Sequence, residues 1–188
     1  MDNATPQKSQ KSPQQNPKIS KTIFAAEQIQ KRVTEVARQI SADYTGKNVH
    51  TICVLENGFM FMSDLVRQIE VPVICDFVRT NVSEKVQGNI VTREIHYGPE
   101  TDVKGHDVLI IEAIVQSGIT SEFLMRNFSS RGAKSVKLCA LLDKQSERKV
   151  MLHPDYFGFL LDESFVVGYG LGAPELGRNL PYIGALAR

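Results

Sequence analysis

The clearest pattern in this chain is Asp107-Val-Leu-Ile-Ile-Glu-Ala-Ile-Val-Gln-Ser-Gly-Ile-Thr120. Residues 108–111 are uniformly apolar, which is typical of a strand that is buried on both faces of a parallel sheet. Small hydroxyl residues and a glycine follow at residues 116–120, and a helix is predicted over residues 121–131. A strand, a glycine-bearing turn and a helix N-terminus together direct backbone N–H groups and partial positive charge at one point. The pattern therefore predicts an α/β unit with a phosphate-binding turn.

Length and composition predict one ordinary globular domain. The 188 residues are enough for a single substantial core and few for two. The net charge of +1 provides no field that would favour DNA or an anionic membrane, so neither is expected as a partner. No segment has the length and apolarity of a membrane span or a secretory signal. The cytoplasm is the expected compartment.

Cysteine and histidine positions predict no special chemistry. Three cysteines occur at wide spacings within apolar runs, which indicates reduced thiols in a core: Cys53, Cys75 and Cys139. Three histidines lack the spacing of metal ligands: His50, His96 and His106.

The chain divides into a polar tail and one domain. Residues 1–20 are rich in Gln, Ser, Pro and Lys and predict a disordered N-terminal tail, and residues 21–188 form the expected domain. A helix is predicted over residues 25–44 from apolar residues at spacings of three and four. The elements expected next are a strand over 49–55, a turn at 56–58, a helix over 59–69, a strand over 71–78, a polar loop over 79–88 and a strand over 89–97. The elements expected after the helix over 121–131 are a strand over 136–142, a charged loop over 143–150, and short strands within 153–159 and 165–169. This order predicts a mainly parallel α/β sheet with crossover helices.

Four segments of the chain resemble the type I phosphoribosyltransferases, specifically the bacterial hypoxanthine/guanine kind. They are Ile52-Cys-Val-Leu-Glu-Asn-Gly-Phe59, residues 108–120, residues 153–159, and residues 165–169 with 178–184. The resemblance covers residues 23–186 and implies an α/β fold: a twisted, mainly parallel sheet flanked by helices, with a small hood formed by the chain ends.

The resemblance also implies a reaction. Such enzymes transfer the phosphoribosyl group of 5-phosphoribosyl-1-pyrophosphate to a purine base with Mg²⁺, and release a nucleoside monophosphate and pyrophosphate in purine salvage. They assemble as dimers or tetramers, so a homo-oligomer is expected. Their transition state has oxocarbenium character and needs a base for the purine proton, cations for the pyrophosphate, and exclusion of water.

Several family positions are retained. The resemblance assigns the 5-phosphate to the turn of Gln116, Ser117, Gly118, Ile119 and Thr120, in which Ile119 should matter least because the backbone makes most contacts. It assigns purine stacking and backbone recognition to two residues near the C-terminus, and a pyrophosphate contact to a third: Phe165, Val166 and Arg178.

The acidic positions of the family are altered. The family carries Glu-Asp before two aliphatic residues and an Asp after them, whereas this chain has Glu112, Ala113 and then Gln116. Glu112 can still meet a ribose hydroxyl and remains a candidate Mg²⁺ ligand, whereas Ala113 has no ligand atom. Gln116 stands at the position of the family's general base, and an amide cannot accept a proton at neutral pH.

Other positions lose charge or change its sign. A Lys-Gly turn that faces pyrophosphate in the family is Glu56-Asn57 here. The lysine that reads the purine 6-oxo group is matched to His153, and a late aspartate that helps to hold Mg²⁺ is matched to Gly172. Residues 79–83 lack the Ser-Tyr pair of the family's closing loop.

Three functions remain open from the sequence. The favoured interpretation is a homologue that binds a purine nucleoside monophosphate, GMP or IMP, but has impaired or lost transferase activity and acts as a sensor or regulator. The alternative is an active purine phosphoribosyltransferase that uses 5-phosphoribosyl-1-pyrophosphate and Mg²⁺ by an altered mechanism. The third is a folded subunit that associates with an active relative.

Overall fold

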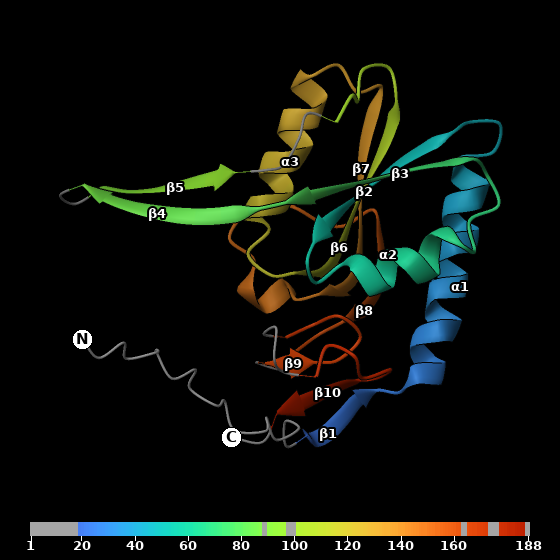
Figure 1. Ribbon diagram of the computed structural model, residues 1–188, viewed down its shortest axis with the longest axis vertical. Coiled ribbons are helices and arrows are strands. Elements are labelled where there is room, and N and C mark those ends of the chain that lie inside the picture. The colour runs from blue at the N-terminus through green and yellow to red at the C-terminus, as the bar shows by residue number, and fades with distance from the viewer. Residues whose placement is uncertain (1–18, 88–89, 97–100, 163–164, 173–176, 187–188) are drawn as a thin grey trace, which may run out of the picture.

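A five-stranded parallel sheet forms the centre of the molecule (Figure 1). The structure, a computed structural model, describes residues 19–87, 90–96, 101–162, 165–172 and 177–186. The strands are, in the order in which they lie across the sheet, β3 (Val73–Arg79), β2 (Val49–Leu55), β6 (Asp107–Val115), β7 (Ser135–Asp143) and β8 (Tyr156–Leu160). β6 occupies the middle, and the register pairs Thr51 of β2 with Leu109 and Leu109 with Lys137 of β7. A central strand needs apolar residues on both faces, which explains the run at the start of β6.

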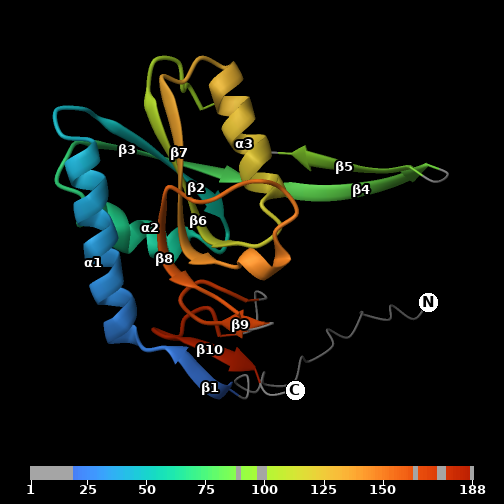
Figure 2. The same ribbon diagram turned by 180° about the vertical axis from the view of Figure 1, so that it is seen from behind.

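Helices cover both faces of this sheet. α1 (Ala26–Asp43) and α2 (Phe59–Val66) pack on one face, and α3 (Ile119–Ser130) packs on the other, as Figures 1 and 2 show. The stripe on α1 that includes Ile29, Val36 and Ile40 is at most 1% exposed. Full burial of a side chain of this size contributes about 1.5–3 kcal/mol to stability, so this stripe anchors α1 to the sheet.

A second, antiparallel sheet brings the two ends of the domain together. β10 (Ile183–Leu186) lies between β1 (Ile19–Phe24) and β9 (Val166–Val167), and Thr22 of β1 pairs with Gly184 of β10. We call this sheet the hood; it lies beyond β8 in Figure 2. The fold class expected from the sequence, including a hood formed by chain ends, is thus observed. The boundary of the expected tail was wrong, because Ile19 and Ser20 belong to β1; residues 1–18 lie outside the described part.

The polar segment after β3 was wrongly expected to be a loop. Asn81–Gln87 forms strand β4 and pairs antiparallel with β5 (Ile90–His96), so that Asn81 lies opposite His96. The hairpin projects from the body of the molecule in Figure 1. Pairing with a neighbouring strand satisfies backbone groups even where the sequence lacks apolar alternation, and that pairing cannot be read from local composition.

The remaining boundaries differ by a few residues. α2 ends at Val66 instead of residue 69, β6 continues to Val115, and α3 begins at Ile119. The charged loop after β7 contains a short 3₁₀ helix, Gln145–Glu147. No helix among the described residues has the length and apolarity needed to cross a membrane.

Candidate functional site

Three adjoining cavities lie where the parallel strands end. The first, of about 480 Å³, is lined by Gln116, Ser117 and residues 146–149. The second, of about 360 Å³, shares Gln116 with the first. The third, of about 170 Å³, shares Asn57 and Ile114 with the second. Ligands of α/β proteins bind outside the carboxyl ends of the strands, so these cavities form the candidate site.

The turn from Gln116 to Thr120 has the geometry of an anion site. Gly118 has φ +76° and is the N-cap of α3, so the N-terminus of a twelve-residue helix faces the turn. A Cβ at this position would lie 2.9 Å from Val150 Cγ2 and 3.0 Å from Arg148 Cδ, which leaves no space for a side chain. Both the left-handed backbone and the close contact require glycine. Exposed N–H groups and the helix dipole at this point suit a phosphate.

Arg148 stabilises this turn through a hydrogen bond to its backbone and an ion pair with Asp143. Its Nε donates a hydrogen bond to the backbone oxygen of Gln116 (2.9 Å), and its Nη2 donates to the carboxylate of Asp143. The backbone N–H of Lys149 donates to Ser117 O (3.0 Å). The Asp143 side chain is 1% exposed and that of Arg148 is 11% exposed, so the pair is buried. Both residues were predicted in the charged loop over residues 143–150; their opposite charges, directly after a buried strand, are the sequence feature that could have indicated the ion pair.

Glu112 is buried beside the turn. The hydroxyl of Ser121 on α3 donates a hydrogen bond to its Oε1 (2.6 Å), and the residue is 9% exposed. Burial raises the pKa of the Glu112 carboxyl to about 7, opposed by the Ser121 hydrogen bond and the charge of Arg148. The residue lines the third cavity together with Ala113, which is 3% exposed and has no polar side-chain atom.

The second cavity is a mainly apolar slot. Phe165 and Val166 line it together with Ile114, and Gly172 and Gln116 lie at its border. Phe165 is 53% exposed, so its side chain is accessible to a ligand. An exposed aromatic ring beside aliphatic side chains suits the stacking of a planar heterocycle. Gln116 supplies an exposed amide to this slot.

His153 does not lie in this slot. It is exposed and stands two residues before Asp155, whose carboxylate accepts a hydrogen bond from Leu138 N (2.8 Å). Leu138 lies five residues before Asp143, the last residue of β7, so this part of the chain is away from the carboxyl edge. The structure therefore does not bring His153 together with the other expected purine-binding residues.

Lys144 is a cation that the sequence analysis missed. It follows the last residue of β7, and its N–H donates to the oxygen of Val115 (2.9 Å), the last residue of the neighbouring strand β6, which places it beside Gln116. The residue is 2% exposed, and its Nζ lies 2.7 Å from Glu147 Oε1. A lysine immediately after a predicted buried strand is the sequence feature that could have identified this residue.

Glu56 and Arg178, both expected near pyrophosphate, are in direct contact. Arg178 Nη1 lies 2.8 Å from Glu56 Oε2, and Arg79 Nη2 lies 2.6 Å from Glu56 Oε1. The guanidinium of Arg178, with the charge of Arg79, holds the pKa of the Glu56 carboxyl below its usual value. The Leu55–Glu56 peptide bond is cis. Asn57 lines the second and third cavities, and its buried Oδ1 has no hydrogen-bond partner within the described part of the chain.

The residues around the cavities do not fit a resident Mg²⁺ ion. Among the described residues no group of three or more His, Cys, Asp or Glu side chains is arranged to hold a metal. Gly172 has no side-chain ligand atom, and Glu112 is the one carboxylate among the described residues that line the second or third cavity. Mg²⁺ prefers one or two ionised carboxylates together with substrate phosphates, so Glu112, whose pKa is raised to about 7, is a poor donor.

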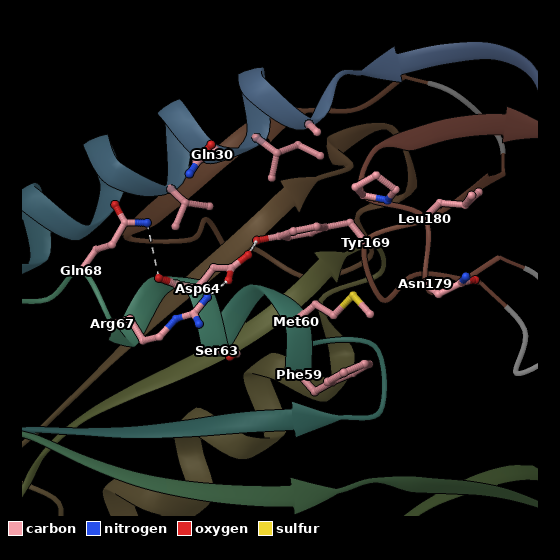
Figure 3. A pocket seen from close by; sticks show the side chains of 14 residues that line it. Gln30, Phe59, Met60, Ser63, Asp64, Arg67, Gln68, Tyr169, Asn179 and Leu180 are labelled. Atoms are coloured by element: carbon pink, nitrogen blue, oxygen red, sulfur yellow. Dashed lines mark hydrogen bonds and ion pairs between the residues drawn. The ribbon is translucent and has the colours of Figure 1, made fainter.

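A fourth cavity lies apart from this site. It has a volume of about 510 Å³ and lies between α1, α2 and the hood. Figure 3 shows Tyr169, two residues after β9, pointing to Asp64 on α2, where its hydroxyl donates a hydrogen bond of 2.5 Å. None of the expected site residues lines this cavity. This cavity is therefore separate from the candidate site.

Comparisons with known proteins identify the family to which the chain belongs. Residues 20–173 match the family described as "Phosphoribosyl transferase domain". The chain is 39% identical to the hypoxanthine-guanine phosphoribosyltransferase of Bacillus subtilis, over 89% of this chain and 93% of the relative. It is 40% identical to the bifunctional protein TilS/HprT of Listeria innocua over 89% of its length, but it spans about a quarter (26%) of that relative. A crystal structure of a hypoxanthine-guanine phosphoribosyltransferase from Bacillus anthracis superposes with a TM-score of 0.80 at 35% identity, and covers 92% of this chain and 100% of the other. The chain belongs to the phosphoribosyltransferase family and is a homologue of the hypoxanthine-guanine phosphoribosyltransferases.

Proposed function

We propose that this protein binds a purine nucleoside monophosphate, GMP or IMP, and that its transferase activity is impaired or lost. The observation that carries the proposal is an intact anion-binding turn beside an apolar slot, whose neighbouring positions 113 and 116 hold Ala and Gln. Such a protein retains the contacts for a nucleotide but lacks groups for the reaction. A role as a sensor or regulatory subunit follows from binding without turnover.

Each part of the nucleotide has a proposed partner. The backbone N–H groups of the turn from Gln116 to Thr120 would bind the 5-phosphate. The purine would stack on Phe165, with Val166 offering backbone groups to its edge. We propose Lys144, which lies next to Gln116, as the cation nearest the purine in place of His153.

The proposed loss of activity has a chemical reason. Gln116 can donate a hydrogen bond to a purine nitrogen but cannot take its proton, and losing a positioned general base costs about 10²–10⁴-fold in rate. The Glu112 carboxyl, with its pKa raised to about 7, is only partly ionised at neutral pH. It can accept a hydrogen bond from a ribose hydroxyl in its ionised form, so sugar binding should strengthen as pH rises.

Calorimetric titration with GMP, IMP and guanosine tests the binding proposal. We expect both nucleotides to bind at concentrations below about 1 mM, and guanosine, which lacks the phosphate, to bind at least about tenfold more weakly. Failure of both nucleotides to bind at millimolar concentration would overturn the proposal.

An active enzyme is the second candidate, because the Bacillus subtilis relative is similar over 93% of its length. Incubation with 5-phosphoribosyl-1-pyrophosphate, Mg²⁺ and hypoxanthine, guanine or xanthine decides between the two. Nucleotide formation well above a protein-free control would support this candidate. No formation above that control, in a sample that binds GMP, would support the first.

Assembly and location are further proposals. By family, we propose a homo-oligomer, a dimer or tetramer, which sedimentation velocity would detect as a mass that is a multiple of 21.0 kDa.

The cysteines Cys53, Cys75 and Cys139 are all unpaired, which supports a reducing compartment such as the cytoplasm.

A further inference from the structure

Glu56 joins three segments of the chain through two ion pairs. It follows β2, whereas Arg79 ends β3 at the base of the β4–β5 hairpin and Arg178 precedes the last strand of the hood. Each carboxylate oxygen of Glu56 meets a different guanidinium, at 2.6 Å and 2.8 Å. Nε of Arg178 also donates to Gly172 O (2.9 Å), so its guanidinium is oriented from both sides.

These ion pairs border the second and third cavities. Thr80, next to Arg79, and Leu55, next to Glu56, line the third cavity, and Gly172, bonded to Arg178, lines the second. No lysine or arginine is among the described residues that line either cavity. Arg79 and Arg178 contribute positive charge at this border, and the single carboxylate of Glu56 offsets one of their two charges from within the chain.

The two anion positions of the site thus differ. The turn from Gln116 to Thr120 presents the N-terminus of α3, which is open to a phosphate. At the border formed by Arg79 and Arg178, a second phosphate group would find both guanidinium groups already paired with the carboxylate of Glu56. It would also be repelled by the negative charge of that carboxylate. Like charges brought together at a binding site oppose association.

We propose that Glu56 is a specificity-determining residue that occupies Arg79 and Arg178 as an internal anion, so that the site selects ligands with one phosphate group and rejects those that also carry a diphosphate. This inference rests on the proposed function and deepens it. It predicts discrimination against the diphosphate group whether that group is free or attached to a sugar.

The test compares inorganic pyrophosphate, 5-phosphoribosyl-1-pyrophosphate and GMP by calorimetry, in the wild type, Glu56→Gln and Glu56→Lys. Glutamine keeps the size of the side chain and removes its charge, which leaves both guanidinium groups charged and unneutralised. We expect Glu56→Gln to bind both diphosphate ligands about tenfold or more tightly than the wild type, and Glu56→Lys to bind them at least as tightly. GMP affinity should change by less than about threefold, because its phosphate sits on the turn.

Two control variants and a comparison at two salt concentrations test whether the charge of Glu56 is the cause. Glu35→Gln removes a carboxylate of similar exposure, 41% against 44% for Glu56, that also pairs with an arginine, and it should leave all three affinities unchanged. Adding Arg178→Met to Glu56→Gln should reverse most of the gain for the diphosphate ligands. The gain should also shrink between about 50 mM and about 500 mM salt, because exposed charges are screened.

The outcomes separate this inference from the proposed function. If Glu56→Gln binds pyrophosphate within twofold of the wild-type affinity, while melting shows it to be folded, the inference is overturned. If the wild type does not bind GMP but Glu56→Gln still gains pyrophosphate affinity, the proposed function fails and the role of Glu56 stands. If the wild type binds pyrophosphate as tightly as GMP, Glu56 does not discriminate.

Discussion

Replacing Glu112 with glutamine should stabilise the protein above neutral pH. Glu112 is buried, and its oxygen accepts a hydrogen bond from Ser121 (2.6 Å). A glutamine amide oxygen can accept the same hydrogen bond without placing a charge in the core. The substitution therefore isolates the cost of an ionised carboxylate at this position.

The magnitude follows from the two states of the carboxyl group. Its pKa rises from an ordinary value of 4.5 to about 7 in the folded protein, because burial disfavours the charged form. Below pH 4.5 it is protonated whether the chain is folded or unfolded, and it imposes no cost. Between these two pKa values the unfolded chain ionises while the folded one stays protonated, so stability falls as pH rises. Above the folded pKa the cost is complete, about 3 kcal/mol.

Urea denaturation measured at intervals between about pH 4 and about pH 9 tests this reasoning. The difference in free energy of unfolding between Glu112→Gln and wild type should be near zero at the acidic end and favour the variant by about 2–3 kcal/mol at the basic end. Glu35→Gln, whose side chain is 41% exposed, should not remove the pH dependence. A difference that is constant with pH, or that favours the wild type at basic pH, would refute the assignment of Glu112 as a buried, partly protonated acid.

Three further variants address the turn and positions 113 and 116. Gly118→Ala should destabilise the protein by about 1–3 kcal/mol and weaken GMP binding, because φ is +76° and a Cβ would lie 2.9 Å from a neighbouring side chain; thermal melting and calorimetry measure both effects. Arg148→Met should cost about 3–5 kcal/mol in urea denaturation, because it removes the cation from the buried Asp143 carboxylate and leaves only the hydrogen bond from Gln145 Nε2; a loss below about 1 kcal/mol would contradict the importance of that buried ion pair. Ala113→Asp combined with Gln116→Asp should raise nucleotide formation from hypoxanthine above the wild-type level without reaching that of active relatives, since other positions remain altered. If GMP still binds this double variant and no activity appears, the loss lies elsewhere in the site.

Local patterns in the sequence predicted most of the central sheet and its helices. The apolar spacing from Ile29 to Ile40 predicted a helix over residues 25–44, and α1 spans Ala26–Asp43. The strand over 49–55 was predicted with its observed bounds as β2. The turn at Gly118 was also predicted, because glycine and small hydroxyl residues between a strand and a helix have few alternative conformations. These features depend on neighbours within one or two helical turns, so their information is local.

Contacts between distant residues were decided by the tertiary structure. Glu56 and Arg178 are 122 positions apart. The sequence indicated that Glu56 is an anion at a position matched to a lysine of the family, but it did not indicate an ion pair with Arg178. The register of β6, β7 and β8 places Lys144 at the carboxyl edge of the sheet, which makes it a candidate site residue. The same register places His153 away from that edge, so His153 does not join the site.

The sequence by itself determined the α/β class, the position of the glycine-bearing turn between β6 and α3, and the presence of Ala113 and Gln116 beside that turn. The tertiary structure decided the pairing of β1 with β10, the burial and raised pKa of Glu112, and the partners of Glu56. The physical reason is the range of the forces involved. Periodicity and turn preference act along the chain, whereas burial, sheet register and ion pairing depend on groups that meet only when the chain has folded.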